Sequence, residues 1–180
     1  MKPLKQIICV IFFLILASSS YAQGPASDKD DISALSYLLV EEDTWRIIDG
    51  RDYHRPLPPA STTKVLTTII AIETLKGNEI IKPDRGVLKI PRSKLNLKPG
   101  KGYRAQELIK GTMIESANDA AYALATYIAG SEENFAALMN EKAKKLGAHH
   151  TNFRNASGLY APDQFTTCYD LALIFRYALS

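Results

Sequence analysis

Ser61 and Lys64, three positions apart, are the residues whose types and spacing best suit a chemical reaction. They stand near the start of the run PASTTKVLTTIIAIETL. If this run is helical, residues i and i+3 share one face, so the amine can reach the hydroxyl. A neutral amine at that distance could take the serine proton and make Ser61 a nucleophile. We therefore expect Lys64 to be a general base whose pKa is lowered by burial or by a nearby positive charge.

Serine and lysine at this spacing occur about once by chance in a chain of this length, so the pair is weak evidence by itself. A second cluster, Ser116-Ala117-Asn118-Asp119, supports it. Ser116 offers a hydroxyl that could relay a proton to a leaving group, and the Asn118 amide can both donate to and accept from a peptide bond. The structural alternative is that Asn118 and Asp119 only cap the helix that follows.

The elements that must position these side chains are mainly helical. Apolar residues cover most of the circumference of the helix expected at 61–75, which predicts that it is buried centrally. Thr167 and Asp170 resemble a capping box, so Asp170 is interpreted as a helix cap and not as a catalytic acid. Further helices are expected at 106–113, from Asn118 or Asp119 to Ala129, from Ser131 to about Leu146, and at 171–179.

Strands are expected in the first half of the chain. Residues 33–40 and 44–49 are rich in β-branched and aromatic residues, and the acidic trio 41–43 between them predicts the turn of a β-hairpin. Residues 87–90 suggest another short strand, after which prolines and glycines predict a loop. A two-stranded hairpin is marginal alone, so a sheet that buries so apolar a helix needs more strands.

The first residues have the pattern of a secretory signal peptide. Lys2 and Lys5 precede an uncharged apolar run at 7–17, and small residues follow at 20–22. We expect a leader at 1–22, a flexible segment at 23–31, a catalytic domain at 32–180, and export of the mature protein. Loss of the leader removes two lysines and no acidic residue, so the formal charge falls from +3 to +1 and does not favour nucleic acid as a partner.

The number and spacing of the cysteines and histidines predict neither a metal site nor a disulfide in the mature chain. Cys9 leaves with the leader, so Cys168 remains alone in the mature chain. His54, His149 and His150 lack metal-ligand spacing near a cysteine pair, and the histidine pair is expected at the surface. No metal or cofactor is therefore expected.

Five segments in order resemble the low-molecular-mass penicillin-binding proteins that are serine-type D-Ala-D-Ala carboxypeptidases of peptidase family S11. The segments are PASTTK with ESANDAAYALA, then FAALMNEKAKKLG, TNFRNASGL and FTTCYDLALI, and the resemblance runs from about Ser33 to the end. It implies an α/β (α+β) fold of the β-lactamase and transpeptidase type, with a helical subdomain and an antiparallel sheet. The Ser-x-x-Lys motif itself is typical of this group.

The resemblance also implies roles for single residues. Ser61 would be the acylated nucleophile, Lys64 its base, Ser116 a proton relay and Asn118 a substrate-binding residue. The expected substrate is the D-Ala-D-Ala end of a peptidoglycan stem peptide, with β-lactams as inhibitors. The expected place is the periplasm or the outer face of the cytoplasmic membrane. Asn155 and Gly158 suit a tight turn, with direct substrate contact as the alternative.

The third motif of this family, lysine-threonine-glycine on a late strand, is absent, since Lys76-Gly77 and Lys110-Gly111 lack the threonine. We therefore expect the chain to be an N-terminal fragment of the catalytic domain, inactive by itself. The late strands, and a C-terminal segment that could associate with the membrane, would lie beyond residue 180. The missing strand would supply one oxyanion donor, and the Ser61 backbone N–H would supply the other.

Three other functions remain open at this point. A class A-like β-lactamase is disfavoured, because no glutamate follows Glu141 and Ala117 replaces the aspartate of that class. An esterase or class C enzyme would usually have tyrosine in place of Ser116. A non-catalytic module that binds muropeptides or β-lactams on the same scaffold is disfavoured by the intact serines and lysine.

Overall fold

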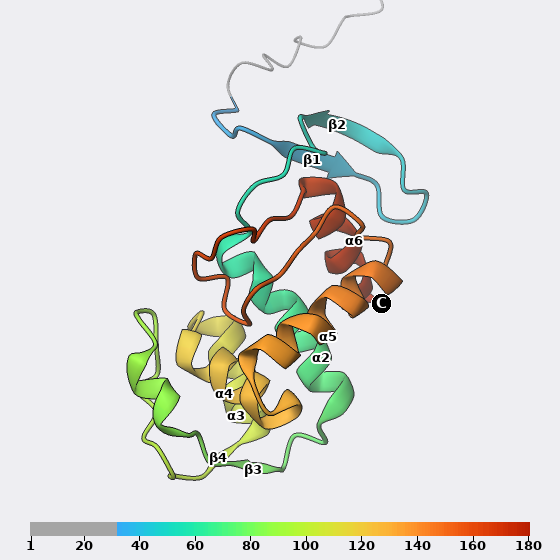
Figure 1. Cartoon of the computed structure of the whole chain (residues 1–180). Coiled ribbons are helices and arrows are strands. Elements are labelled where there is room, and N and C mark those ends of the chain that lie inside the picture. Colours follow the sequence, from blue (N-terminus) through green and yellow to red (C-terminus); the bar gives the residue numbers. More distant parts are fainter. Residues whose placement is uncertain (1–31) are drawn as a thin grey trace, which may run out of the picture. The chain divides into compact units, whose positions relative to one another are not determined.

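One apolar helix organises the structure. The computed structural model describes residues 32–180, and in it a 3-10 turn, η2 (Ala60–Thr62), leads directly into α2 (Thr63–Thr74). Every residue from 63 to 71 is buried, which confirms the prediction of a central helix. The other long helices all contact α2, and Figure 1 shows it running between them.

The expected helices are confirmed, with one extended and one capped differently. Ser131 caps α5 by accepting a hydrogen bond from Asn134 N at 3.1 Å, and α4 ends at Gly130 with φ 79°. However, α4 begins after Ala117 and no side chain caps it, so the expected cap at Asn118 or Asp119 is wrong. The helices are α3 (Ala105–Ile114), α4 (Asn118–Ala129), α5 (Glu132–Lys145) and α6 (Cys168–Leu179).

Helix α6 begins three residues earlier than predicted, because Thr167 caps it. The Thr167 hydroxyl accepts a hydrogen bond from Asp170 N at 3.0 Å. The Asp170 carboxylate binds elsewhere: its Oδ2 accepts from His150 N at 2.6 Å and from the Thr151 hydroxyl at 2.7 Å. Asp170 thus ties the loop before α6 to the helix, and only the threonine half of the predicted capping box forms.

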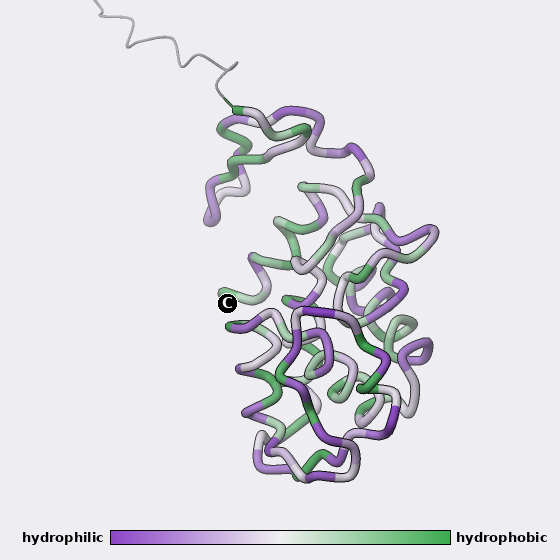
Figure 2. Tube along the Cα trace, turned by 90° about the vertical axis from the view of Figure 1, so that its left-hand side faces the viewer, coloured by the Kyte–Doolittle hydropathy of each residue, from purple (hydrophilic) through white to green (hydrophobic). Residues whose placement is uncertain are grey.

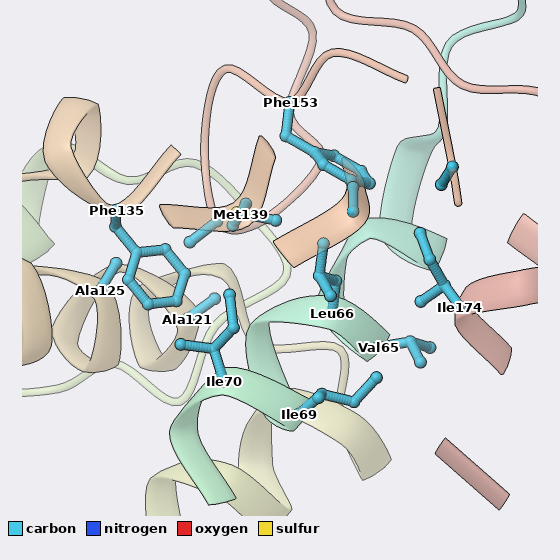
Figure 3. Close-up of a cluster of buried hydrophobic side chains, with 13 residues drawn as sticks. Val65, Leu66, Ile69, Ile70, Ala121, Ala125, Phe135, Met139, Phe153 and Ile174 are labelled. Atoms are coloured by element: carbon cyan, nitrogen blue, oxygen red, sulfur yellow. The ribbon is translucent and has the colours of Figure 1, made fainter. Parts of the chain in front are cut away.

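The core consists of the faces where these helices meet. Phe135 and Met139 of α5 pack against α2 and α4, and both are fully buried. Figure 3 shows the Phe135 ring of α5 beside Ala121 and Ala125 of α4 and Ile70 of α2. The cluster includes Val65, Leu66, Ile69, Ile70, Ala121, Ala125, Phe135, Met139, Phe153 and Ile174. This shared core fixes where the start of α2 lies relative to α4.

Two short antiparallel pairs complete the described elements. β1 (Tyr37–Val40) pairs with β2 (Ile47–Arg51), which confirms the predicted hairpin, and β1 contacts α6. Figure 2 shows hydrophobic as well as hydrophilic stretches along this hairpin. Leu39 and Ile48 within it are 54% and 55% exposed. β3 (Ile80–Ile81) pairs with β4 (Tyr103–Arg104), and neither was predicted.

The strand predicted at 87–90 is wrong, because this stretch belongs to a 3-10 helix, η3 (Arg85–Lys89). Asp84 is the N-cap of this 3-10 helix, since its carboxylate accepts a hydrogen bond from Gly86 N at 2.7 Å. The Tyr122 hydroxyl also packs so closely that a Cβ on Gly86 would lie 2.0 Å from it. A glycine and a local cap therefore override the β propensity of the apolar residues that follow.

The predicted leader at 1–22 and flexible segment at 23–31 lie outside the described residues. All elements above belong to one compact unit, Leu35–Ser180. Among residues 32–180, no helix is both long and apolar enough to cross a membrane. The boundary of the catalytic domain at residue 32 stays a prediction.

Candidate active site

The fold places Ser61 and Lys64 side by side at the start of the central helix. Ser61 lies in η2 and is exposed, and Lys64 lies one turn later in α2. Lys64 Nζ is 3.2 Å from Ser61 Oγ, which is hydrogen-bond distance. Because Ser61 stands in the first turn, its backbone N–H has no carbonyl four residues back to bond and can face a ligand. The predicted i, i+3 contact therefore forms.

Lys64 is almost fully buried, although its side chain is one that normally stays in water. It is 2% exposed, and Nζ donates a hydrogen bond of 2.7 Å to the Ser157 carbonyl. Burial lowers the pKa of Lys64 from its ordinary value of 10.5 to about 8. Of the two causes expected for a lowered pKa, burial is the one that operates.

Ser116 completes a chain of three polar groups. It lies in the turn between α3 and α4, and its hydroxyl donates to Ser61 Oγ at 3.0 Å. Its φ of 51° is in the left-handed region, which a residue other than glycine adopts only where its surroundings hold it. The structure thus brings the amine and a second hydroxyl to the same oxygen of Ser61.

Asn118 and Asp119 hold a loop beside this site. Asn118 Nδ2 donates to the Arg92 carbonyl at 2.7 Å, and its backbone N–H donates to the Ser93 carbonyl at 2.7 Å. The fully buried Asp119 carboxylate accepts from Leu95 N and Leu97 N, each at 2.9 Å. No hydrogen bond to the Asn118 side-chain oxygen comes from the described residues, so that oxygen can accept one from a substrate.

A turn at 155–159 closes the site on the side of Lys64. Gly158 has φ 80°, and a Cβ on it would lie 1.7 Å from the Ala60 carbonyl oxygen, so only glycine fits here. A cavity of about 200 Å³ opens beside this contact. It is lined by Pro58, Ala60, Gly158, Tyr160, Ala161 and Gln164. The space is therefore next to the turn of helix that contains Ser61.

The structure places the remaining candidates away from Ser61. His149 and His150 are exposed, as predicted. Within the described part of the chain, no three residues of the metal-binding types cluster closely enough to hold an ion. Cys168 is a free, half-buried thiol whose sulfur lies 3.0 Å from the Ser36 hydroxyl.

Two partners in the site were not predicted, because both are backbone carbonyls. The Ser157 carbonyl accepts a hydrogen bond from the Lys64 amine, and the Arg92 carbonyl accepts one from the Asn118 side-chain amide. Every residue type has such a carbonyl, so residue identity gives no signal for it. The available signal was indirect: Asn155 and Gly158 predicted a turn at this position, and a turn exposes its carbonyls.

Comparisons with known proteins point to one family. A family model described as D-alanyl-D-alanine carboxypeptidase, peptidase S11, matches residues 22–180. The D-alanyl-D-alanine carboxypeptidase DacF of Bacillus subtilis is 32% identical over 99% of this chain and 48% of its own length. The chain thus spans about half the length of this curated relative.

Solved structures show the same fold. The D-alanyl-D-alanine carboxypeptidase DacD from Francisella tularensis superposes with a TM-score of 0.79 at 32% identity, covering 83% of this chain and 37% of that one. Penicillin binding protein 5 from Haemophilus influenzae gives a TM-score of 0.78 at 26% identity, over 82% and 45% of the two chains. The expected fold class, helices with small antiparallel sheets, is confirmed.

Proposed function

Because the chain belongs to peptidase family S11, the D-alanyl-D-alanine carboxypeptidases, we propose that its protein removes the terminal D-alanine from peptidoglycan stem peptides. One observation carries the proposal. Ser61 Oγ, at the exposed start of a buried helix, lies 3.2 Å from the amine of Lys64 and 3.0 Å from the hydroxyl of Ser116. A nucleophile with a base and a proton donor on the same oxygen is suited to acyl transfer.

The first half of the reaction forms an ester. Neutral Lys64 takes the Ser61 proton while Oγ bonds to the carbonyl carbon of the penultimate D-alanine. The backbone N–H of Ser61 donates to the oxygen that gains negative charge. The carbon–nitrogen bond then breaks. The leaving D-alanine amine takes the proton of the Ser116 hydroxyl, and Ser116 takes in its place the proton that Lys64 received from Ser61, so Lys64 is neutral again.

The second half of the reaction restores the enzyme. A water molecule gives one proton to Lys64 and adds its oxygen to the ester carbon. The bond to Ser61 Oγ breaks, Oγ takes the proton that Lys64 received from water, and the shortened peptide leaves as a carboxylic acid. In both halves Asn118 binds the substrate backbone through its side-chain oxygen. We place this activity outside the cytoplasmic membrane, in accordance with the predicted leader.

Penicillins should act as inhibitors by the same chemistry. The strained amide of a β-lactam is similar in shape to the D-Ala-D-Ala peptide bond, so Ser61 would open it and stay acylated. Penicillin binding protein 5 has this fold, and its name attributes penicillin binding to it. No group in the proposed reaction is a metal ion or an organic cofactor.

The direct test is to incubate the full-length protein with a stem pentapeptide ending in D-Ala-D-Ala. We expect free D-alanine to accumulate over many turnovers, and Ser61→Ala to release none. Ser33→Ala, which changes an exposed serine outside the site, is the matched control and should keep the activity. Stoichiometric peptide binding without released D-alanine would instead support a binding module. Rapid turnover of penicillin without peptide cleavage would support a β-lactamase.

A further inference from the structure

The turn that receives Lys64 is shaped by one side chain, Asn155. Its Oδ1 accepts hydrogen bonds from Ser157 N at 3.2 Å, from Ser157 Oγ at 3.2 Å and from Gly158 N at 2.8 Å. Its Nδ2 donates to the Leu159 carbonyl at 2.7 Å. Asparagine bonded in this way to the backbone that follows it folds the chain locally. The orientation of the Ser157 carbonyl therefore depends on this carboxamide.

The folded turn docks on α2 through two consecutive carbonyls. The Ala156 carbonyl accepts from the Thr67 hydroxyl at 2.7 Å, and the Ser157 carbonyl accepts from Lys64 Nζ at 2.7 Å. Thr67 and Lys64 are three residues apart and so share one face of the helix. Gly158 then passes against the Ala60 carbonyl with no room for a side chain. The turn thus covers the amine and keeps water from it.

We infer that Asn155 is a positioning residue for the general base: by shaping the 155–159 turn, it aims the Ser157 carbonyl at Lys64 Nζ and holds the amine against Ser61. This inference rests on the proposed function, in which Lys64 takes the Ser61 proton. With one N–H committed to Ser157 and the side chain enclosed, the amine has a fixed direction toward Ser61 Oγ.

The contacts of Asn155 favour positioning over direct substrate binding. Its side-chain oxygen already accepts three hydrogen bonds and its nitrogen donates one, all of them within the turn. Gln164 reinforces the same turn, since its Nε2 also donates to the Leu159 carbonyl, at 2.7 Å. A substrate would have to displace these bonds to reach the carboxamide.

The lowered pKa of Lys64 is caused by burial and not by the charged groups around the turn. Glu132 of α5 contacts the turn, since its carboxylate accepts from Ala156 N at 3.3 Å, and burial raises the pKa of Glu132. No charged side chain contributes to the lowered pKa of Lys64, which comes from desolvation. Loosening the turn would readmit water and move the Lys64 pKa back toward its ordinary value.

The test is the pH dependence of Ser61 acylation by a fluorescent penicillin, measured on the full-length wild type and on Asn155→Ala. We expect the variant to acylate about tenfold more slowly at pH 7. In a plot of acylation rate against pH, the rising limb, where the rate increases with pH, should lie about one pH unit higher than in the wild type. Asn155→Ser retains an acceptor oxygen for Ser157 N and Gly158 N, so it should recover most of the rate. The dissociation constant of the initial penicillin complex should change little.

Asn140→Ala is the matched structural control. Asn140 holds the same loop by bonding both backbone groups of Phe153, at 2.7 and 2.9 Å, and does not touch the turn's carbonyls. Its loss should lower the melting temperature and leave the rising limb in place. If Asn155→Ala does not fold, Thr67→Val removes the bond to the Ala156 carbonyl and should move the limb in the same direction.

The outcomes separate this inference from the proposed function. If wild type acylates at Ser61 while Asn155→Ala keeps the wild-type pH profile, the positioning role is wrong and the proposed function stands. An equal displacement in Asn140→Ala would also overturn it, because any loosening of the loop would then suffice. Weaker initial binding with an unchanged acylation step would assign Asn155 to the substrate. A wild type that never acylates would overturn the proposed function itself.

Discussion

Lys64 can accept a proton near neutral pH because the fold removes water from its amine. Burial lowers its pKa to about 8, so about one amine in ten is neutral at pH 7. At the ordinary pKa of 10.5 the share would be about one in three thousand. The gain comes from the position of Lys64 in the central helix and from the turn above it, and it requires no charged neighbour.

This origin of the basicity predicts the pH dependence of acylation. Protonated lysine has no lone pair to take the Ser61 proton, so the rate of acylation should rise with pH and level off above about 8. Lys64→Arg should lower the rate at least about 100-fold and remove this limb, because arginine stays protonated. Stopped-flow labelling from pH 6 to 9.5 measures both. A wild-type rate independent of pH over this range would contradict the role of Lys64.

For single residues, contacts between side chains were predictable from the sequence, and contacts to backbone carbonyls were not. The helical spacing predicted the contact between Ser61 and Lys64, and the second cluster predicted a hydroxyl nearby; the structure has both. The Ser157 carbonyl could not be predicted, because its orientation arises both from the hydrogen bonds of Asn155 within the turn and from the docking of that turn on α2. The roles assigned to Ser61, Lys64, Ser116 and Asn118 remain predictions.

Helix α4 acts as an anchor for the loop that precedes α3. Its first residues, Asn118 and Asp119, bond the backbone of residues 92–97 and do not cap the helix. Because the Asp119 carboxylate is fully buried and faces backbone N–H groups, it satisfies donors that have no other partner in the loop. The sequence predicted polar residues at a helix start, for which capping is the commoner use.

Asp119→Asn should destabilise the full-length protein by about 2–3 kcal/mol, because an amide nitrogen would face N–H donors and weaken charge-assisted hydrogen bonds. Urea unfolding followed by circular dichroism measures the loss. Asp163→Asn makes the same substitution at an exposed residue and should change stability by less than about 0.5 kcal/mol. Equal stability of the two variants would show that Asp119 does not anchor the loop.

Element types were predictable where the apolar pattern was long and failed where it was short. The helices at α2, α4 and α5 have three or more turns of apolar periodicity, and packing in the core reinforces the pattern. Residues 87–90 are a short apolar run, so local contacts decided their structure. The Asp84 cap and the close approach of Tyr122 to Gly86 produced a 3-10 helix in place of a strand.

Across the whole unit, the arrangement of the candidate site depends on the core in which the helices meet. Phe135 is fully buried where α5 meets α2 and α4 (Figure 3), and the same three helices set the distance between Ser61 and Ser116. A core residue can therefore affect the site without touching it. The amino-acid pattern predicted the buried faces, but not which residues would meet across them.

Phe135→Ala should cost about 3–5 kcal/mol of stability, through lost apolar burial and the cavity left behind. Phe175→Ala is the matched control on α6, where the ring is 40% exposed, and should cost less than half as much. Thermal unfolding of the full-length variants measures the difference. Similar losses in both would contradict a core centred on α2, α4 and α5.

The central claim is that Ser61 is the nucleophile of a D-alanyl-D-alanine carboxypeptidase. Mass spectrometry of the full-length protein after reaction with penicillin tests this claim most directly. We predict one added penicilloyl group, located on the peptide that contains Ser61, and none in Ser61→Ala. An adduct on another residue, or an equal adduct in Ser61→Ala, would contradict the claim.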